Sequence, residues 1–361
     1  MFADATTEAA AHTIAAIAGD GIGQEVLPAA REVLDAVAGS EGWSLRWRDL
    51  PWGCEWYAQH GEMMPPDWRE QLGGTDGIFL GAIGAPAVPD HISLWGLLIP
   101  IRRTFDQFVN LRPVRLLPGV PSPVRGCTHL DVAIVRENTE GEYSTIGGRS
   151  GTGPDVQAMQ VSVFTTKGCE RVLRYGFELA RRRTGRLVSA TKSNGLVHTM
   201  PLWDEVTRTV AAEFSDVTWQ SMHVDALAAR FVTRPQELDV IVASNLFGDI
   251  VSDLAAAVAG SLGTAPSANL DPTRSHPSMF EPVHGSAPDI AGRGIANPIG
   301  QIWAGAMMLD HLGHPGSARK VVTAIEHALS DEANRPGDLG GTATTRQVTD
   351  AVIADLQKGG D

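Results

Sequence analysis

The sequence has few cysteines, fewer basic than acidic residues, and no long apolar run. Its three cysteines, Cys54, Cys127 and Cys169, lie far apart and form no CxxC pair. Neither a disulfide framework nor a zinc site is therefore expected, and a reducing, cytoplasmic setting is favoured. No apolar stretch is long enough to cross a bilayer. With 29 Lys and Arg against 42 Asp and Glu, the net charge of -13 disfavours nucleic acid and anionic membranes as partners.

The chain of 361 residues, 43% of them hydrophobic, is large enough for two lobes. Short apolar, β-branched runs alternate with helical patterns, which predicts an α/β fold with a largely parallel sheet. The expected strands are 13–18, 76–83, 130–135, 186–191 and 238–243. The Gly-rich stretch 141–162 is either a flexible loop or an extended arm that pairs with another chain. The Pro- and Gly-rich stretch 264–298 is expected to form long shaped loops.

Three of the expected strands end in charged or amide residues. LDVAIV runs into Arg136, RLVSAT runs into Lys192, and LDVIVA runs into Asn245 and then Asp249. In open α/β sheets, ligands bind just beyond the carboxyl ends of the strands. These segments are therefore expected to converge on one cleft.

Asp249 and Asp253 are candidate metal ligands. Four residues apart in a helical pattern, their carboxylates lie on one face, one turn apart. Two like charges so placed repel each other unless a cation lies between them, and Mg²⁺ or Mn²⁺ accepts such oxygen ligands. The alternative is two solvated aspartates near a helix start. Asp225 is by itself a candidate helix N-cap, and would matter as a third metal oxygen.

Arginines and two proton-carrying side chains form a second group of candidates. A dicarboxylate needs planar, bidentate cationic partners, which Arg102, Arg112 and Arg136 could supply. Tyr143 and Lys192 could exchange protons with a substrate hydroxyl held beside a metal. The alternatives are surface arginines, an anchoring aromatic in a loop, and a surface lysine.

The turn GDGIG, at 19–23, does not complete a dinucleotide-binding fingerprint. The GxGxxG pattern would need a further glycine where the chain has Gln24 and Val26. A cofactor would therefore bind elsewhere, and the loop of His284, Gly285, Ser286 and Ala287 could wrap a phosphate or an adenine. Asp289 could accept hydrogen bonds from ribose hydroxyls, which suits NAD rather than NADP. The alternative is an ordinary proline-glycine loop.

Six strings carry a family resemblance: GDGIG, NLRPV, RENTEGEY, SATKSNG, NLFGDIVSDL and FEPVHGSAPDIAGRGIANP. In this order they resemble the isocitrate/3-isopropylmalate dehydrogenase family over about residues 13–330. The resemblance implies a β-decarboxylating hydroxyacid dehydrogenase, a homodimer with shared active sites. It implies two α/β lobes around a large mixed sheet, not a Rossmann domain. The first lobe, on the cofactor side, would be 1–107 with 261–361. The second would be 108–260, with a dimer arm at about 141–165.

The resemblance also implies roles for individual residues. Substrate carboxylates would be bound by Arg102, Arg112 and Arg136. Tyr143 and Lys192 would form the acid–base pair. Mn²⁺ or Mg²⁺ would be held by Asp249 and Asp253 and by Asp225 of the other subunit. The cofactor would be bound by His284, Gly285, Ser286, Ala287, Asp289 and Asn297. Asp289 followed by Ile290 resembles the NAD-specific branch, and whether K⁺ is also needed stays open.

The segment 90–103 indicates the branch. Enzymes for isocitrate carry Ser and Asn where this chain has Gly96 and Leu98, and the isopropylmalate branch carries an acidic residue at Trp95. The segment most resembles the tartrate dehydrogenase/decarboxylase and decarboxylating D-malate dehydrogenase branch, with Leu98 at the substrate. Pro100 lies inside this helical segment and is expected to bend it.

The expected reaction is oxidation of a four-carbon 2-hydroxy dicarboxylate, with or without loss of CO₂. Tartrate would give oxaloglycolate, and D-malate would give pyruvate and CO₂. The main rival within the enzyme class is 3-isopropylmalate dehydrogenase. Two alternative hypotheses come from other functional classes: a metal-dependent hydrolase and a catalytically silent regulatory subunit.

Overall fold

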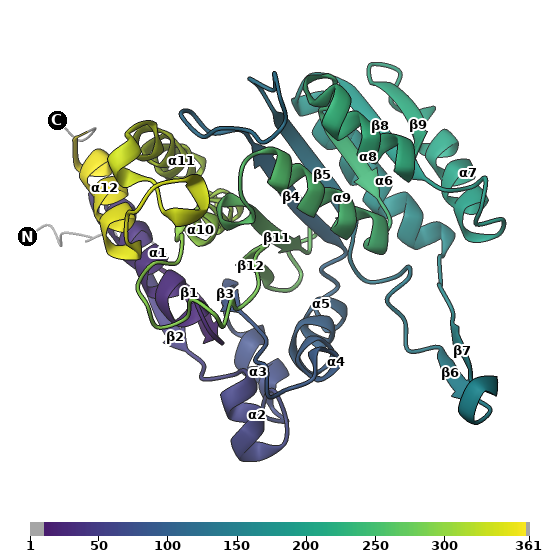
Figure 1. The fold of residues 1–361 in the computed structure, drawn as a ribbon, viewed down its shortest axis with the longest axis horizontal. Helices are drawn as coiled ribbons and strands as arrows, with labels where there is room; N and C mark the ends of the chain where they lie inside the picture. Colours follow the sequence, from purple (N-terminus) through teal and green to yellow (C-terminus); the bar gives the residue numbers. More distant parts are fainter. Residues whose placement is uncertain (1–10, 359–361) are drawn as a thin grey trace, which may run out of the picture. The chain divides into compact units, whose positions relative to one another are not determined.

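The computed structural model describes residues 11–358, which divide into two compact units (Figure 1). Unit 1 takes the described residues up to Leu98 and again from Pro277, and unit 2 is Ile99–His276. The lobe boundaries expected from the sequence lay at 107/108 and 260/261 instead. Both units alternate strands with helices, so the predicted α/β class is confirmed.

Unit 1 is built on four parallel strands in the order β2-β1-β3-β12. Helix α1 packs on this sheet, and α10, α11 and α12 pack with α1 and with one another. The elements are β1 (Ala11–Gly19), α1 (Gly23–Ser40), β2 (Ser44–Asp49), α2 (Cys54–His60), α3 (Trp68–Gly73), β3 (Gly77–Ala82), α4 (Asp90–Ser93), the π-helical turn η1 (Leu94–Leu98), β12 (Ser278–Pro282), α10 (Ile299–His311), α11 (Pro315–Ser330), the 3-10 turns η5 (Glu332–Asn334) and η6 (Gly337–Leu339), and α12 (Thr345–Lys358).

Unit 2 holds six strands in the order β11-β4-β5-β10-β8-β9. Strand β4 is antiparallel to both β11 and β5, and the remaining pairs are parallel, so this sheet is mixed as predicted. The elements are α5 (Ile99–Thr104), β4 (Val109–Arg115), β5 (Asp131–Glu137), β6 (Gly147–Ser150), β7 (Gln157–Gln160), α6 (Thr166–Arg182), β8 (Arg186–Thr191), α7 (Thr199–Ala211), β9 (Thr218–His223), α8 (Val224–Thr233), β10 (Val240–Ala243), α9 (Asn245–Val258) and β11 (Pro266–Leu270), with 3-10 turns η2 (Gly153–Asp155), η3 (Pro235–Glu237) and η4 (Leu262–Thr264).

Helices α6 and α9 cover opposite faces of the unit 2 sheet. A Cβ added at Gly176 of α6 would lie 2.2 Å from Val242 of β10, so Val242 points toward α6. Val242 is in register with Val135 of β5, and the next residue, Arg136, points to the other face because successive side chains alternate. Arg136 contacts α9 there. Residues that end β5 are thereby presented to α9.

The five strands expected from the apolar runs are confirmed as β1, β3, β5, β8 and β10. The expectation of long loops over 264–298 was wrong, because this stretch contains β11 and β12. Every residue of both strands is buried. Their sequences, PSANL and SMFEP, are short and mix polar with apolar residues, so they lack both the alternation and the apolar run that indicate a strand.

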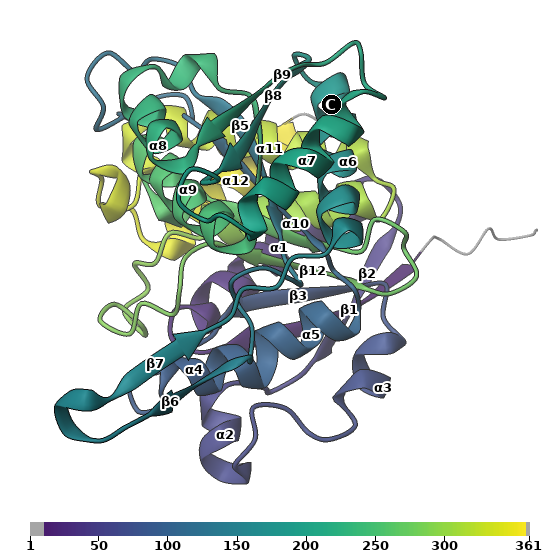
Figure 2. The ribbon, with the colours of Figure 1, turned by 90° about the vertical axis from the view of Figure 1, so that its right-hand side faces the viewer.

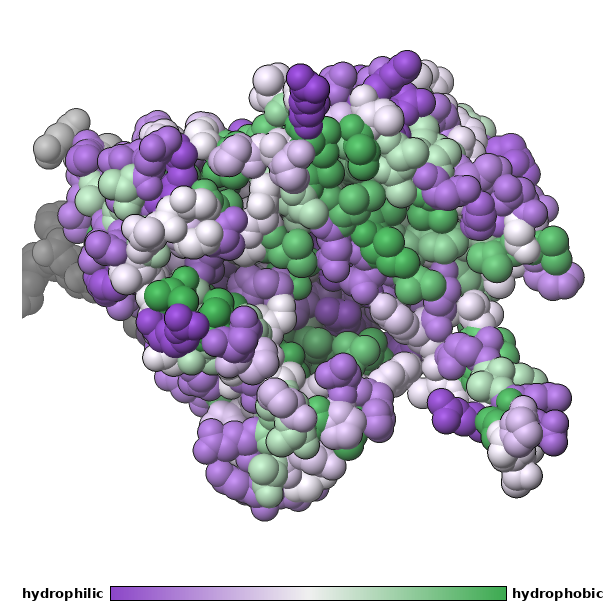
Figure 3. Space-filling view, viewed as in Figure 1, coloured by the Kyte–Doolittle hydropathy of each residue, from purple (hydrophilic) through white to green (hydrophobic). Residues whose placement is uncertain are grey.

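The Gly-rich stretch after β5 contains an antiparallel pair of strands, β6 and β7, joined by η2 (Figures 1 and 2). All eight strand residues are exposed. Apolar side chains on and beside this pair are exposed, including Met159 of β7, which is 63% exposed. Figure 3 also shows hydrophobic residues gathered over α8 and α9, where Ile250 is 56% exposed. Both features leave apolar surface of unit 2 in contact with solvent in the single chain.

No helix within residues 11–358 combines the length and the apolar character needed to cross a bilayer. The cysteines Cys54, Cys127 and Cys169 are free thiols.

Gly176 tests the packing of α6 on the sheet. We expect Gly176→Ala to lower the free energy of unfolding by about 1–3 kcal/mol, because its methyl group would overlap Val242 in a closely packed core. The measurement is urea unfolding followed by circular dichroism. Gly316→Ala on α11 is the matched control, since nothing lies within 4 Å of its added Cβ. The same loss in both variants would contradict the packing argument.

Candidate active site

Two arginines from neighbouring strands lie side by side on the α9 face of the unit 2 sheet. Arg112 of β4 is in register with Ile134 of β5. Ile134 and Arg136 are two residues apart on β5, so their side chains share a face, and Arg112 shares it too. Both guanidinium groups are buried, with relative exposures of 6% for Arg112 and 2% for Arg136. Two buried cations side by side require an anion between them.

Asp249 supplies that negative charge. Its Oδ1 accepts from Nη1 of Arg136 at 2.5 Å and lies 3.0 Å from Nη1 of Arg112. The hydroxyl of Tyr143 donates to Oδ2 at 2.9 Å. Burial opposes ionisation of this carboxyl, but the charges of the two arginines outweigh it and lower the pKa of Asp249. Asp249 is therefore a carboxylate held at the centre of the cluster.

Tyr143 holds its proton in this cluster. Burial and the neighbouring charge of Asp249 raise the pKa of Tyr143, against the opposing effect of Arg136, whose guanidinium lies 5.6 Å from the ring centre. The backbone carbonyl of Tyr143 accepts from Arg103 at 2.6 Å. The phenol is thus fixed in place and stays protonated at neutral pH.

Asp253 and Arg102 complete the cluster. Oδ1 of Asp253 lies 3.6 Å from Nη1 of Arg112, and the side chain is half exposed. Burial raises the pKa of Asp253 against the attraction of Arg112, and the charge of Asp249 raises it further. Arg102 is buried, and its charge contributes to the lowered pKa of Asp249. Five side chains that the sequence proposed as substrate or metal ligands, with Tyr143, therefore meet in unit 2.

Three polar residues that the sequence analysis did not select orient the arginines. Oδ1 of Asn245 accepts from Nε and Nη2 of Arg136 at 3.1 and 2.7 Å. Arg112 donates to Ser252 through Nη1 and to Asn110 through Nε, each at 2.7 Å. The sequence placed Asn245 at a strand end near the expected cleft but gave it no role. Ser252 and Asn110 had no such signal.

The close approach of α9 to β5 depends on Gly248. A Cβ at this position would lie 2.6 Å from Cβ and 2.7 Å from Cγ of Arg136. The absence of a side chain lets the helix rest against the arginine stem, which brings Asp249 within reach of the guanidinium group. Any larger residue would push the helix and the arginine apart.

Lys192 and Asp225 form a separate pair in unit 2. Nζ of Lys192 lies 2.9 Å from Oδ1 of Asp225, and the hydrogen bond from Lys192 lowers the pKa of that carboxyl. One interpretation of the sequence made Asp225 a helix N-cap, and this was wrong. It lies in the first turn of α8, and His223 is the N-cap. Within residues 11–358, no three His, Cys, Asp or Glu side chains are grouped closely enough to hold a metal ion. One chain therefore does not bring Asp225 to Asp249 and Asp253.

The cofactor candidates lie together in unit 1, on the segment that follows β12. Nδ1 of His284 is 3.0 Å from the carbonyl of Gly285, while Nε2 is buried and has no hydrogen-bond partner among the described residues. Burial lowers the pKa of His284, so its ring is neutral. Ala287 has the left-handed φ of +40°, which is uncommon for a residue with a side chain. A buried ring nitrogen without a partner fits a ligand that supplies the missing hydrogen bond.

The other cofactor candidates differ in their surroundings. Ser286 is buried and its carbonyl accepts from the backbone of Ile22, whereas Gly285 and Asp289 are exposed. Asn297 is already engaged: its Nδ2 donates to Asp338 at 3.0 Å and its Oδ1 accepts from the backbone of Ile299 at 3.0 Å. Asn297 therefore shapes this segment whether or not it also contacts a ligand.

The segment 90–103, which indicated the branch of the family, is helical throughout and consists of α4, η1 and the start of α5. Leu98 ends the π-helical turn η1, and Pro100 lies at the second residue of α5. Proline lacks the backbone N–H, and the first turn of an α-helix tolerates that lack. The structure shows a change of helix type just before Pro100, and a bend at Pro100 stays a prediction.

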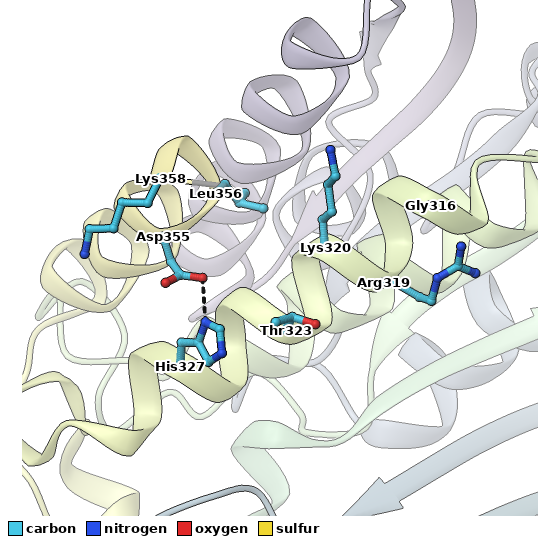
Figure 4. Close-up of a pocket in the computed structure, with 8 residues that line it drawn as sticks. All are labelled: Gly316, Arg319, Lys320, Thr323, His327, Asp355, Leu356 and Lys358. Carbon is cyan, nitrogen blue, oxygen red and sulfur yellow. Dashed lines mark hydrogen bonds and ion pairs between the residues drawn. The ribbon is translucent and has the colours of Figure 1, made fainter. Parts of the chain in front are cut away.

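Unit 1 also has a groove between α11 and α12 (Figure 4). His327 of α11 faces Asp355 of α12 at 3.0 Å, while Arg319, Lys320 and Lys358 point in different directions. No residue proposed from the sequence lines this groove. Because its cations diverge instead of converging on one point, the groove is not the candidate active site.

Known proteins are similar to this chain in both sequence and structure. The sequence model of the isocitrate/isopropylmalate dehydrogenase family matches residues 13–352. D-malate dehydrogenase [decarboxylating] of Escherichia coli is 55% identical over 351 residues, covering 94% of this chain and 97% of the relative. Tartrate dehydrogenase/decarboxylase of Pseudomonas putida is 52% identical over 358 residues, covering 96% and 98%. Isocitrate dehydrogenase of Methylococcus capsulatus has a similar structure, with a TM-score of 0.88, 34% identity, and coverage of 96% and 99%.

Removing the charge of Asp249 and removing that of Asp253 should have different effects on the free energy of unfolding in metal-free buffer at pH 7. Asp249→Asn should lower the free energy of unfolding by about 2 kcal/mol, less than for a fully buried pair because Asp249 is one-third exposed. Its folded-state pKa is lowered, so this stability should be lost as the pH falls through that pKa. Asp253, whose pKa is raised, is destabilising when charged, and Asp253→Asn should be neutral or stabilising.

The measurement is urea unfolding of both variants and the wild type from pH 7 downward, with a chelator present. Asp253→Asn is the matched control, since it removes the same charge from the same helix one turn away. An equal loss of unfolding free energy in the two variants would contradict the described cluster. So would a loss in Asp249→Asn that stays the same as the pH is lowered.

Proposed function

Because the chain belongs to the isocitrate/isopropylmalate dehydrogenase family, we propose that it oxidises D-malate or tartrate with NAD as the hydride acceptor. Family membership makes it an enzyme of the decarboxylating dehydrogenase type that acts on a small molecule, as the sequence resemblance predicted. The preference among four-carbon 2-hydroxy dicarboxylates, the use of NAD and the metal requirement are the parts that we propose.

The observation that carries the proposal is the buried arginine cluster. Arg102, Arg112 and Arg136 bring three positive charges, against two carboxylates from Asp249 and Asp253. The excess of positive charge attracts an anionic substrate. Planar guanidinium groups bind carboxylates through paired hydrogen bonds, which fixes the orientation of the acid as well as its position.

Tyr143 is proposed as the proton donor. Its raised pKa keeps the proton on the phenol at neutral pH, and Asp249 holds the hydroxyl at a fixed position. After loss of CO₂ the enol carbon of the product needs one proton, and the Tyr143 hydroxyl supplies it. Arg136 lies close enough to stabilise the resulting phenolate.

Asp249 and Asp253 fit a divalent cation in part. Their oxygens are of the type that Mn²⁺ and Mg²⁺ prefer, and the mutual repulsion that helps to raise the pKa of Asp253 would be relieved by a cation. When bound, the metal would act as a Lewis acid on the substrate oxygens. Within one chain the donor set has two carboxylates, and we propose that Asp225 of a second subunit completes it.

The segment 284–297 is proposed to bind NAD. The unpartnered Nε2 of His284 supports this role, and the exposed carboxylate of Asp289 suits ribose hydroxyls and disfavours an added phosphate. The nicotinamide would accept the hydride from C2 of the substrate. Whether K⁺ is also required stays open.

We also propose a homodimer with shared active sites, and the way unit 2 divides the proposed catalytic residues supports it. Tyr143 belongs to the Asp249 cluster, whereas Lys192 is paired with Asp225. If Asp225 reaches the metal of the other subunit, Lys192 comes with it and helps to remove the substrate hydroxyl proton there. The exposed apolar residues Met159 of β7, Val232 of α8 and Ile250 of α9 supply surface for such an interface.

The relatives support a four-carbon substrate. Their names specify D-malate and tartrate, and the whole chain is about half identical to theirs. Gly96 and Leu98 offer no hydrogen bond from a side chain to a third carboxylate, which disfavours isocitrate. The free thiols of the described chain suit the cytoplasmic setting that we propose.

A substrate panel tests the proposed reaction. With NAD and Mn²⁺, we expect D-malate or a tartrate to reduce NAD faster than isopropylmalate or isocitrate, with NADH absorbance and CO₂ release followed together. The same panel with NADP and with chelator tests the cofactor and the metal, and both should be much slower. Faster turnover of isopropylmalate than of either four-carbon acid would overturn the proposed substrate.

Mixed dimers test the shared site. Tyr143→Phe and Lys192→Met should each lose nearly all activity, because each removes one proton-carrying group. Mixing the two chains under exchange conditions should restore about a quarter of wild-type activity, since half of the dimers are mixed and each holds one intact site.

The matched control mixes Tyr143→Phe with Asp249→Asn. These residues share one cluster within a chain, so no intact site forms and no activity should return. Recovery in this control, or no recovery for Tyr143→Phe with Lys192→Met once mixed dimers are demonstrated, would contradict the division of the site.

A further inference from the structure

The turn GDGIG remains without a role in the proposed reaction, although it opens α1. We propose that this turn and the first residues of α1 position the NAD-binding segment 284–297, with Glu25 as the principal positioning residue. The inference rests on the proposed function, because it concerns the segment to which the cofactor is assigned. Glu25 itself would touch neither cofactor nor substrate.

Glu25 binds the backbone of two glycines in that segment. Its Oε1 accepts from the backbone N–H of Gly292 at 2.5 Å, and its Oε2 accepts from that of Gly294 at 2.8 Å. Both glycines have left-handed φ angles, +75° and +64°, which residues with side chains rarely adopt. One carboxylate thus satisfies two backbone donors in a segment whose conformation no regular secondary structure maintains.

The turn before Glu25 holds the other end of the segment. The N–H of Ile22 donates to the carbonyl of Ser286 at 2.8 Å. Gly21 approaches the same carbonyl so closely that an added Cβ would lie 2.1 Å from its oxygen. Ile22 and Val26 also form a buried cluster with Ala296. The segment is therefore attached to the start of α1 at Ser286, at the two glycines and at Ala296.

These attachments flank or adjoin the proposed cofactor contacts. Asp289 lies between Ser286 and Gly292, and His284 lies two residues before Ser286, whereas the two oxygens of Glu25 accept from Gly292 and Gly294. A segment held in its binding conformation loses less freedom when the ligand arrives, which strengthens binding without a new contact. The alternative is that Glu25 only complements the positive end of the α1 dipole, which would stabilise the helix but leave cofactor affinity unchanged.

The test is Glu25→Gln. The amide keeps one oxygen acceptor and turns an N–H₂ group toward the second glycine, so one of the two hydrogen bonds is lost. We expect the Kd for NAD to rise by about tenfold, because a hydrogen bond to a charged group contributes that much or more. The KM for the hydroxy acid and kcat at saturating NAD should change little. Backbone hydrogen exchange should accelerate at Gly292 and Gly294.

Glu32→Gln is the matched control, because it removes the same charge from the same helix. The carboxylate of Glu32 is paired with Arg346 on the surface. This variant should leave the Kd for NAD and the exchange rates unchanged. If Glu25→Gln is too unstable to assay, Glu25→Asp serves as the second variant, since its shorter side chain keeps the charge but withdraws both oxygens from the glycines.

The outcomes separate the inference from the proposed function. A wild-type protein that binds no NAD overturns the proposed function. A wild type that binds NAD, with a Glu25→Gln variant of equal affinity, overturns only the positioning role. A lower melting temperature with an unchanged Kd for NAD also overturns it, because that is the effect of a residue that merely stabilises α1.

Discussion

The unit 2 structure depends on a single carboxylate between two buried arginines. Strand register places Arg112 and Arg136 on one face of the sheet, where two desolvated cations would repel each other. Asp249 makes this arrangement possible, and it does so only because Gly248 lets α9 approach β5. Burial and these charges together then set the protonation of the cluster: Asp249 stays ionised and Tyr143 stays protonated. The packing of α9 on the sheet therefore also determines the acid–base state of the cluster.

Much of this architecture could be read from the sequence where the local pattern and the tertiary environment agree. The strand ending in Arg136 is a continuous apolar run, and a buried parallel strand has that composition. Asp249 and Asp253 could be placed on one helix face from their spacing alone. Spacing could not decide whether the two carboxylates were solvated or belonged to a charged cluster, because that depends on Arg112, which lies far away in sequence. The six ordered motifs supplied the missing long-range information.

Other features could not be predicted, for physical reasons. Strands β11 and β12 carry prolines and polar residues, since their stability comes from neighbouring strands and from contacts such as that of Asn110 with Ser267 and Asn269. Asn110 and Ser252 orient Arg112, and the contact with Ser252 joins segments that are distant in sequence. No local sequence pattern predicts such contacts. The turn GDGIG was recognised as a sharp turn, but its attachment to Ser286 joins residues more than two hundred positions apart.

Gly248 has a consequence for how this enzyme could change over time. The position accepts no other residue without moving Arg136, so the charged cluster, where we propose that substrate carboxylates bind, is closed to gradual mutation. The helical pieces around Leu98, by contrast, already depart from regular α-helix and offer side chains that can vary independently. New acid specificities in such a scaffold would accumulate on that segment, while the charged cluster passes unchanged from one descendant enzyme to the next.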